Sequence, residues 1–153
     1  MATRVAVLSD THGLLRPEVM KAVGACDAVI HAGDFDNTMV LDTLQRMAPV
    51  YAVRGNNDWY LPEGVPMSLA FRIENCRFFM VHDKQDVPHG LDNVDVVIYG
   101  HSHKYAEDTV DGRLWLNPGS CGRRRFRTDV TYAILTVDGA HVTVEKEMID
   151  AAE

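Results

Sequence analysis

The sequence has few cysteines, no long apolar run and no excess of basic residues. Its three cysteines, Cys26, Cys76 and Cys121, form no Cys-x-x-Cys pair, which argues against a disulfide framework or a structural zinc knuckle. No stretch approaches the roughly 18 apolar residues that a membrane span requires. The run Val5–Leu8 is too short for a signal peptide and ends at Asp10, so a cytoplasmic protein with reduced thiols is expected.

Acidic residues outnumber basic ones by 22 to 15, which gives a formal net charge of -7 for the 153 residues. A broad electrostatic grip on nucleic acid needs a basic face, so no stable nucleic-acid complex is expected. Bound divalent cations reverse the local potential where carboxylates hold them, so a small phosphate-bearing substrate is compatible with this charge. The length and an ordinary composition predict one globular domain over residues 1–153.

The first third of the chain alternates between short apolar runs and amphipathic segments. Strands are predicted at 4–9, 28–32 and 50–53. Helices are predicted at 17–25 and from an expected N-cap at Asn37 through Met47. This alternation predicts a parallel sheet with crossover helices.

The rest of the chain has a pattern of short strands and tight turns that predicts β-hairpins. The expected elements are a hairpin over 68–81, a strand at 94–99, a hairpin turning at Asp111-Gly112, another turning at Asp138-Gly139, and one helix around Val87–Leu91. This part is therefore predicted to be mostly antiparallel, and the whole chain to be of mixed α/β class.

Side chains that can bind metal ions follow five of the predicted strands, where each strand ends. They are Asp10, His12, Asp34, Asn56, His82, His101 and His103. Ligands of open α/β sheets bind beyond the carboxyl ends of strands, so these residues are expected to gather. Carboxylate, amide and imidazole ligands without thiolate suit Mn²⁺, Fe²⁺, Co²⁺, Ni²⁺ or Zn²⁺ in a catalytic site. Two such ions would polarise a phosphoryl group and activate water for in-line attack.

The chain resembles the calcineurin-like metallophosphoesterases, and in particular their compact bacterial and archaeal phosphodiesterase branch, through six motifs. These are Ser9-Asp10-Thr11-His12-Gly13, Gly33-Asp34, Gly55-Asn56-Asn57-Asp58, His82, Gly100-His101-Ser102-His103 and Asn117-Pro118-Gly119-Ser120. The resemblance implies a four-layer sandwich of two mixed β-sheets flanked by helices. It also implies hydrolysis of phosphodiesters with a metal-bound hydroxide as nucleophile, and a homo-oligomer.

The resemblance further implies an assignment of the ligands to a binuclear centre. One ion would take Asp10, His12 and His103, and the other Asn56, His82 and His101, with Asp34 bridging them. Mn²⁺ is the expected metal, and Ni²⁺, Fe²⁺, Co²⁺ and Zn²⁺ are alternatives. The implied catalytic residues are Asp34, Asn56, Asn57 and His101.

Two positions depart from the family pattern. Many members place a histidine, which can protonate the leaving group, where this chain has Asn57. An amide cannot act as an acid near neutral pH, so diesters with good leaving groups are favoured. The residue after His82 is usually glycine and is Asp83 here, so the local loop and its substrate contacts are expected to differ.

Several features have more than one interpretation. His31 is either a buried, hydrogen-bonded histidine or a residue that orients a ligand. Arg123-Arg124-Arg125 with Arg127 is either a solvated loop or the source of one phosphate-binding arginine. Trp59 and Tyr60 either line the mouth of the site or pack under their own loop or against a second subunit.

Two alternative functions remain open at this point. One is a scaffold for protein assembly, as in a subunit of the retromer coat that has a similar fold. The other is a phosphomonoesterase or nucleotide pyrophosphohydrolase that uses the same metal site.

Overall fold

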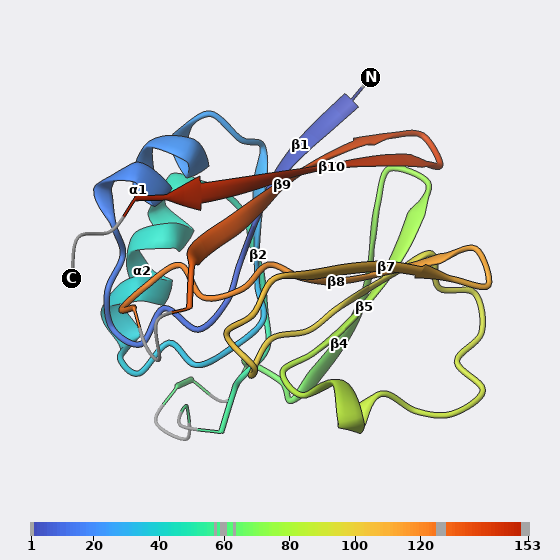
Figure 1. Cartoon of the computed structure of the whole chain (residues 1–153), viewed down its shortest axis with the longest axis horizontal. Coiled ribbons are helices and arrows are strands. Elements are labelled where there is room, and N and C mark those ends of the chain that lie inside the picture. The colour runs from blue at the N-terminus through green and yellow to red at the C-terminus, as the bar shows by residue number, and fades with distance from the viewer. Residues whose placement is uncertain (1, 57, 59–60, 63, 125–127, 151–153) are drawn as a thin grey trace.

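The structure is a computed structural model that describes residues 2–56, 58, 61–62, 64–124 and 128–150. In this part of the chain, two mixed sheets face each other (Figure 1). Each sheet has five strands, in the orders β10-β9-β1-β2-β3 and β4-β5-β6-β8-β7. The predicted pair of mixed sheets is therefore confirmed.

The first sheet begins with the parallel strands β1 (Ala2–Leu8), β2 (Ala28–His31) and β3 (Val50–Ala52). These strands were predicted from their apolar runs. The last hairpin, β9 (Val130–Asp138) and β10 (His141–Ile149), adds to the same sheet because β9 pairs antiparallel with β1. That long-range pairing has no local signal in the sequence.

The second sheet contains β4 (Ser68–Ile73), β5 (Cys76–Val81), β6 (Val96–Ile98), β7 (Ala106–Val110) and β8 (Arg113–Asn117). The hairpins β4-β5 and β7-β8 are antiparallel, as predicted. Strand β6 is parallel to both of its neighbours, β5 and β8, so the expectation of a mostly antiparallel second part was wrong for this strand. The segments between these strands carry the chain back across the sheet, which permits parallel pairing.

Both α-helices lie against the outer face of the first sheet (Figure 1). Helix α1 (Pro17–Gly24) begins at a proline, and α2 (Thr38–Met47) begins after the predicted N-cap Asn37, whose Oδ1 accepts a 3.2 Å hydrogen bond from the Val40 amide. In the described residues, neither helix is long and apolar enough to cross a membrane.

The outer face of the second sheet carries the short 3₁₀ helix η1 (Lys84–Asp86) and irregular chain. The helix expected around Val87–Leu91 is absent from this described segment. The physical reason is local: Pro88 has no amide hydrogen to donate, and Gly90 has a φ of +70°. The Asp83 side chain caps η1 by accepting a 3.0 Å hydrogen bond from the Gln85 amide.

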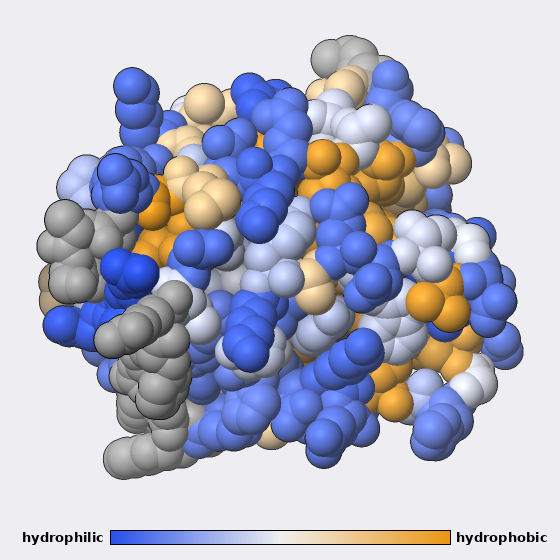
Figure 2. Space-filling view, in the orientation of Figure 1, coloured by the Kyte–Doolittle hydropathy of each residue, from blue (hydrophilic) through white to orange (hydrophobic). Residues whose placement is uncertain are grey.

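Alternating strand residues form two apolar cores. Between the sheets lie residues such as Val7, Ile30, Phe78, Ile98 and Leu135. Between the first sheet and the helices lie residues such as Leu8, Val23, Leu44, Tyr132 and Ile134. Full burial of a side chain of this size contributes about 1.5–3 kcal/mol. On the face seen in Figure 2, hydrophilic residues are spread among smaller apolar patches.

Candidate metal centre

The candidate site lies where the carboxyl ends of strands from both sheets meet. Asp10 follows β1 and Asp34 follows β2 in the first sheet, while His82 directly follows β5 and His103 follows β6 in the second. Backbone hydrogen bonds join these turns, from the Asp10 amide to Gly33 O at 2.9 Å and from the Gly100 amide to His82 O at 2.8 Å. The two sheets therefore contribute ligands to one place, as the strand-end pattern predicted.

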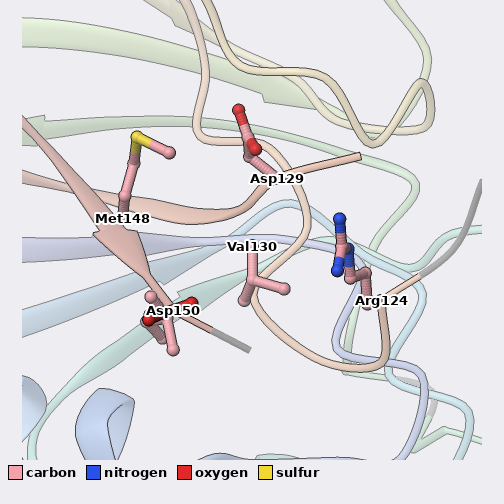
Figure 3. A pocket seen from close by; sticks show the side chains of 6 residues that line it. Arg124, Asp129, Val130, Met148 and Asp150 are labelled. Atoms are coloured by element: carbon pink, nitrogen blue, oxygen red, sulfur yellow. The ribbon is translucent and has the colours of Figure 1, made fainter. Parts of the chain in front are cut away.

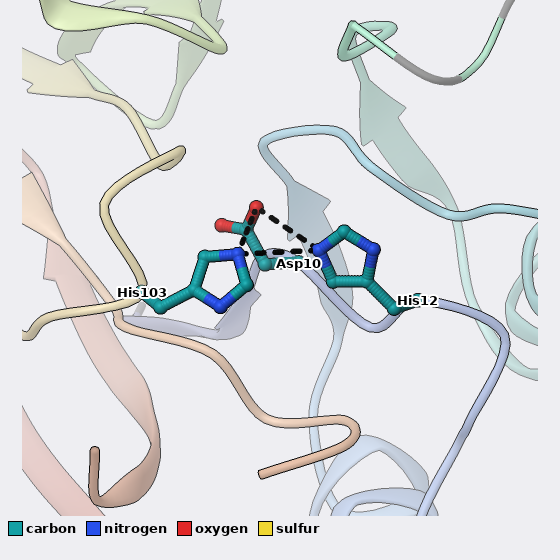
Figure 4. Close-up of side chains that lie close together, drawn as sticks. All are labelled: Asp10, His12 and His103. Carbon is teal, nitrogen blue, oxygen red and sulfur yellow. Dashed lines mark hydrogen bonds and ion pairs between the residues drawn. The ribbon is translucent and has the colours of Figure 1, made fainter. Parts of the chain in front are cut away.

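The first group of candidate ligands is Asp10, His12 and His103 (Figure 4). Asp10 Oδ1 lies 3.7 Å from His12 Nε2 and 3.5 Å from His103 Nε2. The two imidazole nitrogens are 3.2 Å apart. These are the same three residues that the resemblance assigned to one metal ion.

A second group shares Asp10 with the first and adds Asp34 and His82. Asp34 Oδ2 lies 3.2 Å from His82 Nε2 and 3.8 Å from His12 Nε2. Asp10 Oδ1 lies 3.8 Å from His82 Nε2. Both carboxylates therefore reach histidines of both groups, which is what a bridged pair of cations needs.

Hydrogen bonds behind the histidines fix which ring nitrogen faces the site. His82 Nδ1 is 2.7 Å from the carbonyl oxygen of Ala32, which can only accept, so Nδ1 carries the proton. His12 Nδ1 likewise donates to Asp36 Oδ2 at 2.8 Å. In each ring Nε2 therefore faces the carboxylates, where a metal ion would take the place of any proton on it; this is the orientation of a metal-binding histidine backed by an acceptor.

The arrangement fits a divalent cation. Asp10 Oδ1 is fully buried and has no hydrogen-bond partner among the described residues, although four potential ligand atoms surround it. Burial lowers the pKa of His82, but the hydrogen bond that the protonated ring donates to Asp34 and the charges of Asp10 and Asp34 outweigh it and raise the pKa to about 9. A pocket of buried carboxylates thus demands positive charge, which a metal ion supplies.

Among the described residues, His101 lies beside this cluster and not within it. The His101 side chain is 48% exposed, and its ring meets the His82 ring edge-on with centroids 5.3 Å apart. Its amide donates to Asp10 Oδ2 at 3.1 Å, so the residue still touches the site through its backbone. Asn56 is exposed and follows Gly55, at which any side chain would collide with the Asp34 carboxylate. Their ligation of a second ion stays a prediction.

Some predicted site residues lie outside the described part of the chain. These are Asn57, Trp59, Tyr60, Arg125 and Arg127. The described members of the arginine cluster, Arg123 and Arg124, are exposed.

The ligands are held by an unusual backbone. Six non-glycine residues of the site have φ between +47° and +76°, the left-handed region that only a few per cent of such residues adopt; they are Asp10, His12, Asp34, Asp36, His101 and His103. Each such residue costs on the order of 1 kcal/mol or more, so the surrounding contacts must enforce it. The sequence gives no direct signal for this strain.

Asp58 organises the site without facing the metal cluster. Its buried carboxylate accepts four backbone hydrogen bonds: Oδ2 from Asp34 at 2.6 Å and Gly55 at 2.8 Å, and Oδ1 from Phe35 at 2.9 Å and Asp36 at 3.1 Å. In the sequence, Asp58 stands out only as the last residue of the motif Gly55-Asn56-Asn57-Asp58. Its position three residues after a glycine in a turn was the available signal.

His31 is the buried histidine that was predicted. The Gly33 amide donates to Nδ1 at 3.0 Å, so Nε2 carries the proton and donates to Thr11 Oγ1, also at 3.0 Å. Burial lowers its pKa to about 3, which keeps the ring neutral. The ring stacks on Phe35 with centroids 3.6 Å apart.

The turn from Asn117 to Ser120 is hydrogen-bonded to the loops that carry the candidate ligands. Asn117 Nδ2 donates to Gly100 O at 3.2 Å, next to His101. Ser120 Oγ donates to the carbonyl oxygen of Asp10 at 2.9 Å. The turn therefore ties together the loops that carry Asp10 and the paired histidines.

A sequence profile of the calcineurin-like phosphoesterase superfamily domain matches residues 3–140. The chain belongs to this superfamily. Its relatives include a probable metallophosphoesterase of Methanothermobacter thermautotrophicus, 34% identical over 155 residues that cover 92% of this chain and 90% of the relative.

Solved structures of the same fold include an archaeal phosphodiesterase, with a TM-score of 0.78 and 28% identity over 95% of this chain and 99% of that one. Vacuolar protein sorting 29 from Cryptosporidium parvum, at 18% identity and a TM-score of 0.77, covers 98% of this chain and 99% of its own; it shows the fold alone. Superfamily membership and the ligand cluster identify the chain as a metal-dependent phosphoesterase.

Proposed function

We propose that this phosphoesterase hydrolyses small phosphodiesters in the cytoplasm with two divalent metal ions, Mn²⁺ being the preferred metal. The observation that carries the proposal is the pair of overlapping ligand groups that share Asp10. The likeness to the archaeal phosphodiesterase of the same fold supports the choice of substrate class.

Bound divalent ions would polarise the phosphoryl oxygens and make water nucleophilic at neutral pH. The protein residues would hold the metal ions and orient the ligands that bind them. The buried carboxylates of Asp10 and Asp34 supply the negative charge that retains two cations, while Asp36 and the Ala32 carbonyl keep Nε2 of His12 and His82 free to bind them.

Hydroxyl groups around the site have structural partners, which supports water as the nucleophile. Ser9 Oγ donates to Asp10 Oδ2 at 2.7 Å, Ser120 Oγ donates to Asp10 O, and Thr11 Oγ1 is held by His31. The Cys121 thiol is buried, and burial raises its pKa to about 12, so it stays protonated. A covalent intermediate is not required.

With Asn57 in place of an acidic histidine, diesters with good leaving groups are preferred.

The experiment is hydrolysis of bis(p-nitrophenyl) phosphate after chelation and after separate addition of Mn²⁺, Ni²⁺, Fe²⁺, Co²⁺ and Zn²⁺. Wild-type protein is expected to recover activity with at least one metal, most with Mn²⁺, at a ratio of two ions per chain. The Asp34→Asn variant should stay inactive, and Asp42→Asn, an exposed carboxylate on α2, should behave as wild type. Equal rates for wild type and Asp34→Asn under every metal would refute the proposal.

The scaffold alternative finds support only in a shared fold. The likeness to vacuolar protein sorting 29 is at 18% identity, and the two ligand groups here are buried. A purified chain that binds no divalent ion would favour that alternative instead.

A further inference from the structure

A cavity of about 360 Å³ opens directly beside the metal centre. One of its lining residues is His103, whose Nε2 lies 3.5 Å from Asp10 Oδ1. A substrate whose phosphodiester sits at the cluster therefore has this cavity within reach of one of its two ester arms.

Basic residues outnumber acidic ones in the lining of the cavity, in contrast to the chain as a whole. Lys104 and Lys146 line it together with one carboxylate, Asp129, which leaves a surplus of one positive charge in a chain with a net charge of -7. Among the residues that the structure describes, neither lysine forms a salt bridge. Their charges are thus available to a ligand, and metal ions at the neighbouring cluster would add to the positive potential.

Tyr105 gives the cavity a fixed wall. Its hydroxyl donates to Glu107 Oε1 at 2.7 Å, and Lys146 Nζ lies 4.9 Å from the centre of its ring. The cation–π contact places the Lys146 ammonium over the ring without neutralising it. The lysine on β10 is therefore brought to the same cavity as Lys104, which follows the metal-site histidine in the chain.

Three other cavities in the described part of the chain have no metal-site residue in their lining; the one of about 510 Å³ contains Lys84 and Arg113 but none of the candidate ligands. The neighbouring one, of about 290 Å³, shares Asp129 but pairs a single cation, Arg124, with two carboxylates, Asp129 and Asp150; in Figure 3, Arg124 lies across Val130 from Asp150. None of its lining residues belongs to the ligand groups.

We propose that the cavity beside His103 binds a second anionic group of the substrate, so that the preferred substrates are phosphodiesters with a further phosphate or carboxylate on one ester arm. The proposal rests on the proposed phosphodiesterase function and specifies its substrate class. Lys104 and Lys146 are the specificity-determining residues, and Asp129 opposes them.

Two chromogenic substrates isolate the second anion. One is the p-nitrophenyl ester of thymidine 5′-phosphate, and the other is the same ester with an additional 3′-phosphate. Both release the same leaving group from the same kind of diester. In excess Mn²⁺ and low salt, wild-type protein is expected to show a several-fold higher kcat/KM for the 3′-phosphorylated substrate, mainly through KM, and high salt should reduce this preference.

Variants move the preference in opposite directions if charge is the cause. Lys104→Gln and Lys146→Gln should each lower the ratio of the two kcat/KM values by about two- to fivefold, the usual range for an exposed charge pair. Asp129→Asn should raise the ratio. Lys21→Gln, which removes an exposed charge from α1, is the matched control and should leave the ratio unchanged. Denaturant unfolding of each variant checks its fold.

Three outcomes would overturn the inference. They are equal kcat/KM values for the two substrates in wild type, a shift of the ratio in the same direction by Lys146→Gln and Asp129→Asn, or an equal shift by Lys21→Gln. Each of these leaves phosphodiesterase activity intact. Failure of the wild type to hydrolyse either substrate under any metal would instead refute the proposed function.

Discussion

Replacing Asp58 with asparagine tests whether one carboxylate holds the site together. In the wild type, each Asp58 oxygen accepts two backbone hydrogen bonds, from segments 34–36 and 55. Asparagine keeps the shape but turns one oxygen into a donor. Two amide hydrogens would then face an NH₂ group and lose their acceptor, at a buried position.

The expected loss is large on the scale of a small domain. Hydrogen bonds to a charged group contribute about 1.5–3 kcal/mol each, so losing two predicts about 3–6 kcal/mol of destabilisation. Native domains are stable by only about 5–15 kcal/mol. Because Asp34 and Asp36 lie on the released segment, affinity for Mn²⁺ should fall as well, by about tenfold or more.

Urea unfolding gives the stability change, and isothermal titration calorimetry with Mn²⁺ gives the affinity. Asp42→Asn is the control, since it makes the same chemical change at an exposed position of α2. A change in unfolding free energy no larger than that of Asp42→Asn, with unaltered Mn²⁺ affinity, would refute the idea that Asp58 organises the site.

Three further predictions use single contacts or pKa values. Asp36→Asn should weaken Mn²⁺ binding by about 10- to 100-fold in calorimetry, because the charged acceptor behind His12 Nδ1 is replaced by a neutral, weaker one. For His31, the folded pKa of about 3 lies below the unfolded value of 6.5, so the unfolded state binds the extra proton between these pH values. Stability should therefore fall as the pH drops below 6.5, by about 2 kcal/mol at pH 5 from this residue, and His31→Gln should show a shallower fall in urea titrations. Cys121, with its pKa raised to about 12, should react with a disulfide reagent at pH 8 only after unfolding, as mass spectrometry of labelled peptides would show.

Each of these has a clear contrary result. Unchanged Mn²⁺ affinity in Asp36→Asn would show that the hydrogen bond does not tune His12. Parallel pH profiles for wild type and His31→Gln would show that His31 is not the residue that costs stability in acid. Rapid labelling of Cys121 in the native protein would contradict its burial.

Local features of the fold were predictable because their causes are local. Asn37 caps α2 through its own side chain, and Asp138-Gly139 turns the last hairpin, so both are visible in a few adjacent residues. The pairing of β9 with β1 and the parallel setting of β6 bring together distant segments. Apolar runs mark such strands without specifying their partners.

The metal centre was predictable for a related reason. Residues that directly follow a strand lie at its carboxyl end. The order of strands and polar residues along the sequence therefore sufficed to predict that Asp10, Asp34 and His82 lie close together. The sequence does not record that the cluster closes around Asp10 Oδ1, or that His101 stays outside it. Those outcomes depend on tertiary hydrogen bonds, such as the one from the His101 amide to Asp10 Oδ2 and the one from Ser120 Oγ to the Asp10 carbonyl oxygen.

The left-handed backbone of the ligands has a consequence for evolution and engineering. At Asp10, His12, Asp34 and His103, glycine would adopt the positive φ without its conformational cost. Substitution by glycine there would therefore raise the free energy of unfolding but remove a candidate metal ligand. A library screened for heat resistance alone should therefore enrich glycine at these positions and yield robust, inert proteins. Selection that includes turnover must retain the strained residues and seek its stability elsewhere.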